Sequence, residues 1–208
     1  MSVGEKIRKF FHKAEKEGQV ARGKTAKDKT YSSSRTFPDR ELAIEAFQQS
    51  KKKLFDVNRW SEIPNPLSAV FKAFDVNGTP LYSSKIRQGD YIKINLPGPL
   101  PANWVRVIAV KDQENLAEFI VSPSENPTDN KTETKHFFHK GATSTFRTER
   151  KGNTITAYEI GKNEKINVKD PEAGNRKVLN IAVAEGGWAG FQKLQWKNLT
   201  RFLVMESI

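Results

Sequence analysis

Short segments with alternating apolar and polar residues fill the middle of the chain, and they constrain the fold more than any other feature. The alternation is clearest at Ile92, Ile94 and Leu96, which share one face of an extended segment while aromatic and polar residues take the other. Turn signals such as Asn77-Gly78 separate the segments. The expected strands are residues 30–37, 67–76, 90–96, 102–110, 118–122, 143–150 and 154–161. This pattern predicts an antiparallel sheet with one buried face.

Amphipathic helices are expected on either side of this run of strands. Residues 38–60 carry an apolar stripe at helical spacing, and Asp39 is placed to cap the first turn. Residues 186–208 predict the strongest helix of the chain, with a basic ridge opposite a broad apolar face. That apolar face consists of Trp188, Phe191, Trp196, Leu199, Phe202 and Leu203.

Two glutamines, Gln192 and Gln195, fall inside the apolar face of the C-terminal helix. A buried amide needs a hydrogen-bonding partner, so these side chains could face a polar or water-filled cavity. They could also lie at the edge of the face and reach water. The pattern favours the second interpretation.

The N-terminal segment is strongly basic. Residues 1–29 hold nine Lys/Arg and four Asp/Glu, so they contribute +5 to the net charge of +11. Residues 3–16 predict a short basic amphipathic helix, and a polar linker follows it. For a chain of 208 residues, we expect this segment to be separate from one domain that spans residues 30–208.

Several functional classes are excluded or not expected. The chain contains no cysteine, which excludes thiol nucleophiles, cysteine zinc sites and disulfides. No phosphate loop, dinucleotide fingerprint or calcium loop occurs, so no cofactor is expected. No window approaches the ~18 apolar residues of a membrane-spanning helix, and the N-terminus lacks the apolar core of a secretory signal. We therefore expect a cytoplasmic location.

The order of elements and three local stretches resemble the helix-grip superfamily, also called SRPBCC or START-like. This superfamily includes lipid-transfer domains, polyketide cyclases and plant pollen-allergen proteins. Leu54–Pro66 is similar to its helix-to-sheet junction, Gly141–Gly152 to a Gly-x-Thr segment that opens a late strand, and Gln195–Val204 to its closing helix. The resemblance covers residues 30–208 and rests on fold signatures. One departure is a single long helical stretch where two short helices usually follow the first strand.

The resemblance implies an α+β fold in which a curved antiparallel sheet of about six to seven strands wraps around the long C-terminal helix. A cavity between the sheet and this helix would hold a mostly apolar ligand, oriented by a few polar groups. We therefore expect a small-molecule-binding protein whose partner is apolar or amphipathic, such as a lipid. The residues expected to line the cavity are Trp60, Trp104, Phe138, Phe146, Trp188, Gln192 and Gln195.

An enzyme on the same fold is the first alternative, with a cyclase, dehydratase or hydrolase-like activity. His136 or His139 would act with Glu159 or Glu164 as acid and base. On a strand the two histidines point to opposite faces, so no metal site is expected and a structural or surface role is favoured for both. Glu159 would be a buried acid or base if its strand face pointed inward, but the outward orientation is favoured.

The basic N-terminal segment allows a second alternative. Residues 3–16 could recruit the protein to an anionic membrane surface or an acidic partner, although docking of this helix on its own domain is favoured. For the basic charge of residues 1–29 as a whole, a solvated tail is the simpler interpretation. The Lys/Arg-Gly-aromatic signature of RNA-binding sheets is absent, so nucleic acid is not expected as a partner. The sequence predicts no particular oligomeric state.

Overall fold

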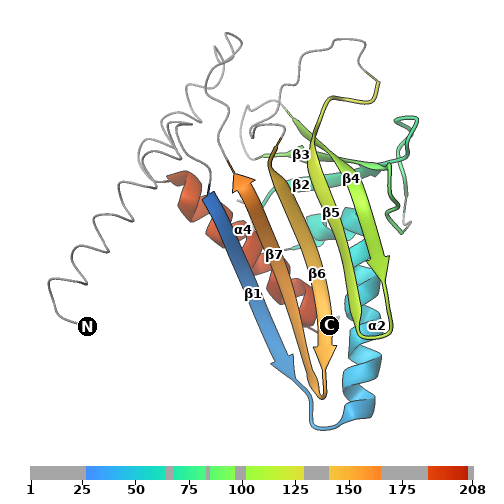
Figure 1. Cartoon of the computed structure of the whole chain (residues 1–208), viewed down its shortest axis with the longest axis vertical. Coiled ribbons are helices and arrows are strands. Elements are labelled where there is room, and N and C mark those ends of the chain that lie inside the picture. Colours follow the sequence, from blue (N-terminus) through green and yellow to red (C-terminus); the bar gives the residue numbers. More distant parts are fainter. Residues whose placement is uncertain are drawn as a thin grey trace, which may run out of the picture.

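A curved antiparallel sheet wraps around the C-terminal helix in the computed structural model, which describes residues 27–63, 68–82, 85–96, 102–128, 141–164 and 187–205 (Figure 1). The strands are β1 (Lys27–Thr36), β2 (Val70–Phe74), β3 (Tyr91–Asn95), β4 (Asn103–Asp112), β5 (Leu116–Ser124), β6 (Thr143–Lys151) and β7 (Thr154–Glu164). The helices are α2 (Arg40–Phe55), the 3-10 helix η1 (Val57–Glu62) and α4 (Gly187–Val204). The seven strands follow the order β1-β7-β6-β5-β4-β3-β2. The predicted sheet and closing helix are confirmed, and the first strand begins earlier than predicted, at Lys27.

The helical stretch after β1 is broken, so the prediction of one long helix is wrong. Asp39 caps α2 as expected, because its carboxylate accepts a hydrogen bond from the backbone N–H of Leu42 at 2.8 Å. The helix ends at Phe55, and Asp56 leaves the helical conformation with φ −91° and ψ 79°. This break lets η1 turn its Trp60 side chain inward, where the indole N–H donates to the carbonyl of Lys53 at 2.9 Å.

An aromatic cluster fills the half of the interior that lies beneath η1. The Trp60 ring is 4.8 Å from that of Phe146, 5.3 Å from that of Phe71 and 5.8 Å from that of Phe119. All four side chains are buried. Aromatic contacts at these distances each contribute about 0.5–1.5 kcal/mol beyond area burial. This half of the interior is therefore packed with side chains.

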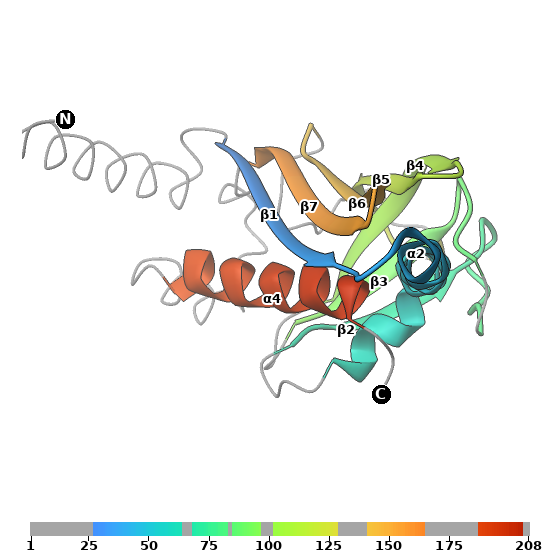
Figure 2. The ribbon, with the colours of Figure 1, turned by 90° about the horizontal axis from the view of Figure 1, so that it is seen from below.

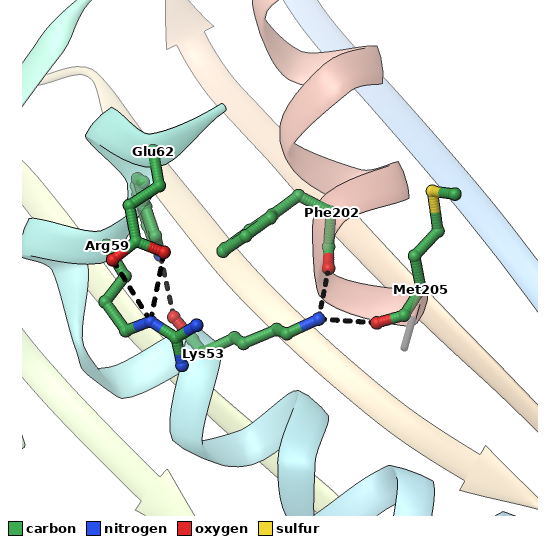
Figure 3. Close-up of polar contacts among 6 residues, drawn as sticks. Lys53, Arg59, Glu62, Phe202 and Met205 are labelled. Carbon is green, nitrogen blue, oxygen red and sulfur yellow. Dashed lines mark hydrogen bonds and ion pairs between the residues drawn. The ribbon is translucent and has the colours of Figure 1, made fainter. Parts of the chain in front are cut away.

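Lys53 holds the C-terminal end of α4 against α2. Its side chain is buried, and its ammonium donates to the carbonyl oxygens of Phe202 at 3.2 Å and Met205 at 2.5 Å (Figure 3). A cation is favourable at this position because the last carbonyls of a helix carry partial negative charge. Figure 3 also shows the neighbouring ion pair between Arg59 and Glu62 on η1, with Nε and Oε2 3.3 Å apart. The lysine thus fixes one end of the helix that the sheet encloses.

The outer edge of β2 is covered by side chains from η1 and by the backbone of Leu81. The Ser61 hydroxyl accepts from the backbone N–H of Phe71 at 2.9 Å and donates to its carbonyl at 3.0 Å. The amide oxygen of Asn58 accepts from the N–H of Ala73 at 2.9 Å, and the N–H of Leu81 donates to the Ala73 carbonyl at 2.9 Å. These bonds satisfy backbone groups that an open edge would offer to a second chain.

Candidate functional site

The other half of the interior is polar, and the pairing of β1, β7 and β6 shows why. Residues directly opposite one another in an antiparallel pair point to the same face. One row across the three strands consists of Lys29, Gly161 and Ser144, and the next consists of Tyr31, Glu159 and Phe146. Phe146 belongs to the core, so these rows lie on the enclosed face. Helix α4 runs along this face beneath β1 and β7 (Figure 2).

Glu159 lies on the enclosed face, so its predicted outward orientation is wrong. Its side chain is 0% exposed, and it lies on the same strand face as the buried Ile155 and Ala157. Within the described residues, neither carboxyl oxygen has a hydrogen-bonding partner of normal geometry. Burial raises the pKa of Glu159 well above its usual value, the nearby Glu164 raises it further, and the Ser144 hydroxyl and Lys29 lower it.

Glu164 reaches the same enclosed face through an irregularity at the end of β7. Strand alternation from Glu159 would turn Asn163 inward and Glu164 outward. Instead the pairing with β1 shifts register, Asn163 adopts a positive φ of 53°, and its N–H donates to the Asp28 carboxylate at 3.0 Å. A bulge of this kind re-aims the next side chain, and Glu164 is 3% exposed. The absence of a side chain at Gly161 leaves room for the carboxyl, since a Cβ there would collide with its Oε1 atom.

Gln192 on α4 connects Lys29 to Glu164. The Lys29 ammonium donates to the Gln192 amide oxygen at 2.6 Å, and the amide nitrogen donates to the Glu164 carboxylate at 3.2 Å. Burial lowers the pKa of Lys29, while the attraction of Glu164, and less strongly of Glu159, raises it. Gln192 is 3% exposed, so its predicted position at the edge of the apolar face is wrong. The bridge accounts for its burial.

Gln195 is buried as well, and again the predicted edge position is wrong. Its amide oxygen accepts from the backbone N–H of Ala69 at 2.9 Å. Its amide nitrogen, the indole N–H of Trp196 and the hydroxyl of Ser68 are buried without a hydrogen-bonding partner among the described residues. Most buried polar groups in folded proteins are hydrogen-bonded, so these donors and the Glu159 carboxyl are the groups that a bound molecule or ordered water would satisfy.

Tyr31 completes the polar half of the interior. It lies opposite Glu159 on β1. Burial, together with the charges of Glu159 and Glu164, raises its pKa to about 12, so it is a neutral hydroxyl near neutral pH. Neither Tyr31 nor Lys29 was predicted as a site residue. Lys29 falls in the predicted linker, and no local pattern indicates which face of the first strand, and so the Tyr31 side chain, is enclosed.

The remaining predicted site residues lie in different parts of the structure. Phe146 faces the interior, where its ring is 5.5 Å from that of Trp196. Trp60 is a core residue in the aromatic cluster described above. Trp104 was predicted wrongly, because it alternates with the buried Val105 and lies half-exposed on the outer face of the sheet, 4.8 Å from the Phe74 ring. The predicted residues His136, Phe138 and His139 lie outside the described residues, as does the side chain of Trp188.

Two hollows on the surface are weaker candidates for a functional site. One, of about 480 Å³, lies along β2 and the segment around Tyr82. The other, of about 500 Å³, lies beside α2 and is lined by several lysines. In the second, Asp112 forms ion pairs with Lys51 and Lys85 that neutralise part of the positive charge. Neither contains a wholly buried titratable group like Glu159 among its lining residues.

The described part of the chain contains no group of three or more His, Cys, Asp or Glu side chains arranged to hold a metal ion. None of its helices combines the length and the apolar character needed to cross a membrane.

Comparison with known proteins gives similarity at the level of fold. No protein-family model and no curated protein matches the chain. A hypothetical protein from Helicobacter pylori, jhp0584, is 10% identical with a TM-score of 0.50, over 88% of this chain and 92% of that one. Norcoclaurine synthase from Thalictrum flavum, solved with dopamine and hydroxybenzaldehyde, is 9% identical with a TM-score of 0.41, over 89% and 92%. Ginseng major latex-like protein 151 from Panax ginseng is 14% identical with a TM-score of 0.37, over 76% and 95%.

The architecture itself is clear, because a seven-stranded antiparallel sheet curls around a long C-terminal helix. The chain therefore has the helix-grip fold that its sequence resembles.

Proposed function

We propose that this protein binds a small amphipathic molecule between helix α4 and the inner face of β1, β7 and β6. The observation that carries the proposal is the carboxyl group of Glu159, which is wholly buried and lacks a hydrogen-bonding partner among the described residues. An unsatisfied buried polar group costs about 1–3 kcal/mol. A ligand that hydrogen-bonds to this carboxyl recovers that energy, and this is a physical reason for the fold to retain the group.

The surroundings of Glu159 match a molecule with one polar end and an apolar body. Lys29, Gln192 and Glu164 provide polar contacts on one side. The aromatic rings of Phe146 and Trp196 form an apolar wall on the other. Ligand sites of this composition use the apolar wall for affinity and the few polar groups for orientation.

The packed aromatic cluster limits how far such a ligand extends. Trp60 and Phe119 are buried behind Phe146, with the Phe119 and Phe146 rings 5.2 Å apart. Because this half of the interior is already filled, the ligand would be confined to the polar half under β1 and β7.

A pair of neighbouring variants tests the location. Ser144 lies on the enclosed face and Thr145 on the outer face of the same strand. We expect Ser144→Phe to occupy the space and abolish the rise in melting temperature caused by any bound probe, whereas Thr145→Phe should leave that rise unchanged. Probes come from a library of amphipathic small molecules, with binding confirmed by native mass spectrometry. Equal effects of the two variants, or no binding by the unmodified protein, would contradict the proposal.

Acid–base catalysis is a second candidate because two of the four predicted catalytic residues, Glu159 and Glu164, are buried on the same face and influence each other's charge. Two neighbouring carboxyls in different environments suit a pair of acid and base. The test is the mass of each bound probe after incubation. Products that appear with the unmodified protein and not with Glu159→Gln support catalysis, and unchanged masses leave binding alone.

A further inference from the structure

We infer that the ligand carries a neutral carbonyl group, as in a ketone, an ester or an amide, and that its oxygen accepts hydrogen bonds from the Trp196 indole and the Gln195 amide of α4. This inference rests on the proposed binding function and deepens it by naming the chemical class of the ligand. It follows from the positions of two adjacent side chains, from the hydrogen bonds that each can make, and from the aromatic rings beside them.

Two consecutive residues of α4 hold buried donors that lack an acceptor. The indole N–H of Trp196 and the amide nitrogen of Gln195 have no hydrogen-bonding partner among the described residues, and Gln195 is 3% exposed. Most buried polar groups in folded proteins are hydrogen-bonded. Two neighbouring donors without partners therefore indicate a place for an acceptor that the described residues do not supply.

The Gln195 amide is held so that its nitrogen, and not its oxygen, is the unpaired atom. Its oxygen accepts from the backbone N–H of Ala69 at 2.9 Å. Exchanging the two ends of the amide would place a donor against this N–H and break the bond. The hydroxyl of Ser68, next to Ala69 in the chain, is also buried and unpaired, so it adds a third group that can donate.

The chemistry of these groups selects a neutral acceptor. An indole N–H and an amide nitrogen donate hydrogen bonds and do not accept them. A carbonyl oxygen has two lone pairs, so it can accept from both donors without bringing a hydrogen that needs its own acceptor. An ammonium group only donates and would leave both N–H groups unpaired. A carboxylate accepts, but burying its charge requires a paired cation, and both donors are neutral.

The Trp196 ring places this acceptor beside the apolar wall of the proposed site. It is 5.5 Å from the ring of Phe146 and 6.4 Å from the ring of Phe71. Phe146 lies opposite Glu159 in the pairing of β6 with β7. The Trp196 side chain is only half-buried, which gives its ring room to adjust to a bound molecule. A ligand whose carbonyl meets Trp196 can therefore lay its apolar body along Phe146, toward Glu159.

The experiment compares probes that share one apolar skeleton and differ in the polar group. Acetophenone only accepts hydrogen bonds, ethylbenzene has no polar group, α-methylbenzylamine only donates near neutral pH, and benzoate is a charged acceptor of the same shape as acetophenone. A second set with the same groups on naphthalene covers a longer site. Dissociation constants come from NMR titration of the intact protein. In one set we expect the ketone to bind about tenfold more tightly than the amine and the carboxylate.

Trp196→Phe is the test variant, because it keeps an aromatic ring and removes the N–H donor. Trp104→Phe, on the outer face of the sheet, is the matched control. The first should weaken the binding of the ketone by about tenfold and leave the binding of the hydrocarbon unchanged. Comparing the two probes cancels the cost of removing each from water. The control should change neither dissociation constant.

The indole N–H signal of Trp196 gives a second measurement that needs no variant. In the unmodified protein it should move downfield with the ketone, because a hydrogen bond forms, and should move less with the hydrocarbon. The indole N–H of Trp60 is the internal reference, since it already donates to the Lys53 carbonyl at 2.9 Å.

Three results would overturn the carbonyl ligand and leave the proposed binding function intact. These are an amine or carboxylate that binds as tightly as the ketone, a Trp196→Phe variant that weakens ketone and hydrocarbon equally, and a Trp196 indole signal that moves no further with the ketone than with the hydrocarbon. If no probe of either set binds the unmodified protein, the binding function itself is contradicted.

Discussion

Replacing Glu159 by glutamine should change how the stability of the ligand-free protein depends on pH. Burial raises the pKa of Glu159 in the folded protein well above its usual value, whereas the same group in the unfolded chain titrates near pH ~4.3. Between these two values the folded protein holds one more proton than the unfolded chain. The favourable contribution of the protonated group is complete below the unfolded pKa and is lost as the pH rises toward the folded one.

The magnitude follows from this difference of one proton. The free energy of unfolding of the unmodified protein should fall by about 1.4 kcal/mol for each pH unit inside this window because of Glu159. Glutamine has a similar shape and no proton to lose, so the variant lacks this slope. Over two pH units the variant should gain about 2.7 kcal/mol relative to the unmodified protein.

The assay is urea unfolding followed by tryptophan fluorescence, repeated from about pH 4 to about pH 8 for the unmodified protein, Glu159→Gln and the exposed control Glu45→Gln. The curves for the first two should nearly coincide at the acidic end and separate as the pH rises. The control should run parallel to the unmodified protein. If the free energies of unfolding of Glu159→Gln and the unmodified protein differ by the same amount at every pH, the Glu159 carboxyl is not buried as described.

Three further substitutions test other parts of the structure. Lys53→Met should lower the free energy of unfolding by roughly 2–4 kcal/mol, because it removes the ammonium that binds the last carbonyls of α4. Lys52→Met, at an exposed position, should lower it little. Equal losses for the two variants would refute the role of Lys53. Asn58→Ala should lower the free energy of unfolding by about 1–3 kcal/mol. Because it uncovers the β2 edge, it should also promote concentration-dependent association, measured by light scattering. The control Glu62→Ala should not associate. Asp39→Ala should lower the unfolding free energy by about 1 kcal/mol through loss of the helix cap, and an unchanged value would mean that the cap contributes nothing.

The sequence predicted the architecture well because the architecture depends on periodicity. Alternation located the strands, and the helical stripe located α4, which is buried along Leu199 and Leu203. The break after Phe55 was missed because Asp56 does not interrupt the apolar stripe strongly enough to end a helix in the sequence pattern. The inward turn of Trp60 depends on a contact with α2 that no local pattern contains.

The polar site could be predicted only in part because it depends on register and on charge compensation. Glu159 and Glu164 were recognised as candidates, but the outward orientation was favoured for Glu159, and burying a carboxylate is costly unless it is compensated. The compensating groups lie far away in the sequence, on β1 and α4. The bulge at Asn163 reverses the alternation by one residue and brings Glu164 inward. Strict period-two alternation would place Glu164 on the outer face.

The expectations for the N-terminal segment stay predictions. Residues 1–26 lie outside the described residues, so recruitment of the protein to an anionic surface is untested, as is the cytoplasmic location. Flotation of the protein with anionic vesicles, with and without residues 1–26, measures the recruitment. Loss of salt-sensitive flotation on deletion is the predicted result if the basic charge acts in recruitment.

The most direct test of the account is an NMR titration of the Glu159 side-chain carboxyl carbon in the ligand-free protein. We predict that this signal titrates at a pH well above that of an ordinary glutamate carboxyl, because burial raises its pKa. A Glu159 carboxyl that titrates near pH ~4.3, the usual value for glutamate, would contradict the buried site.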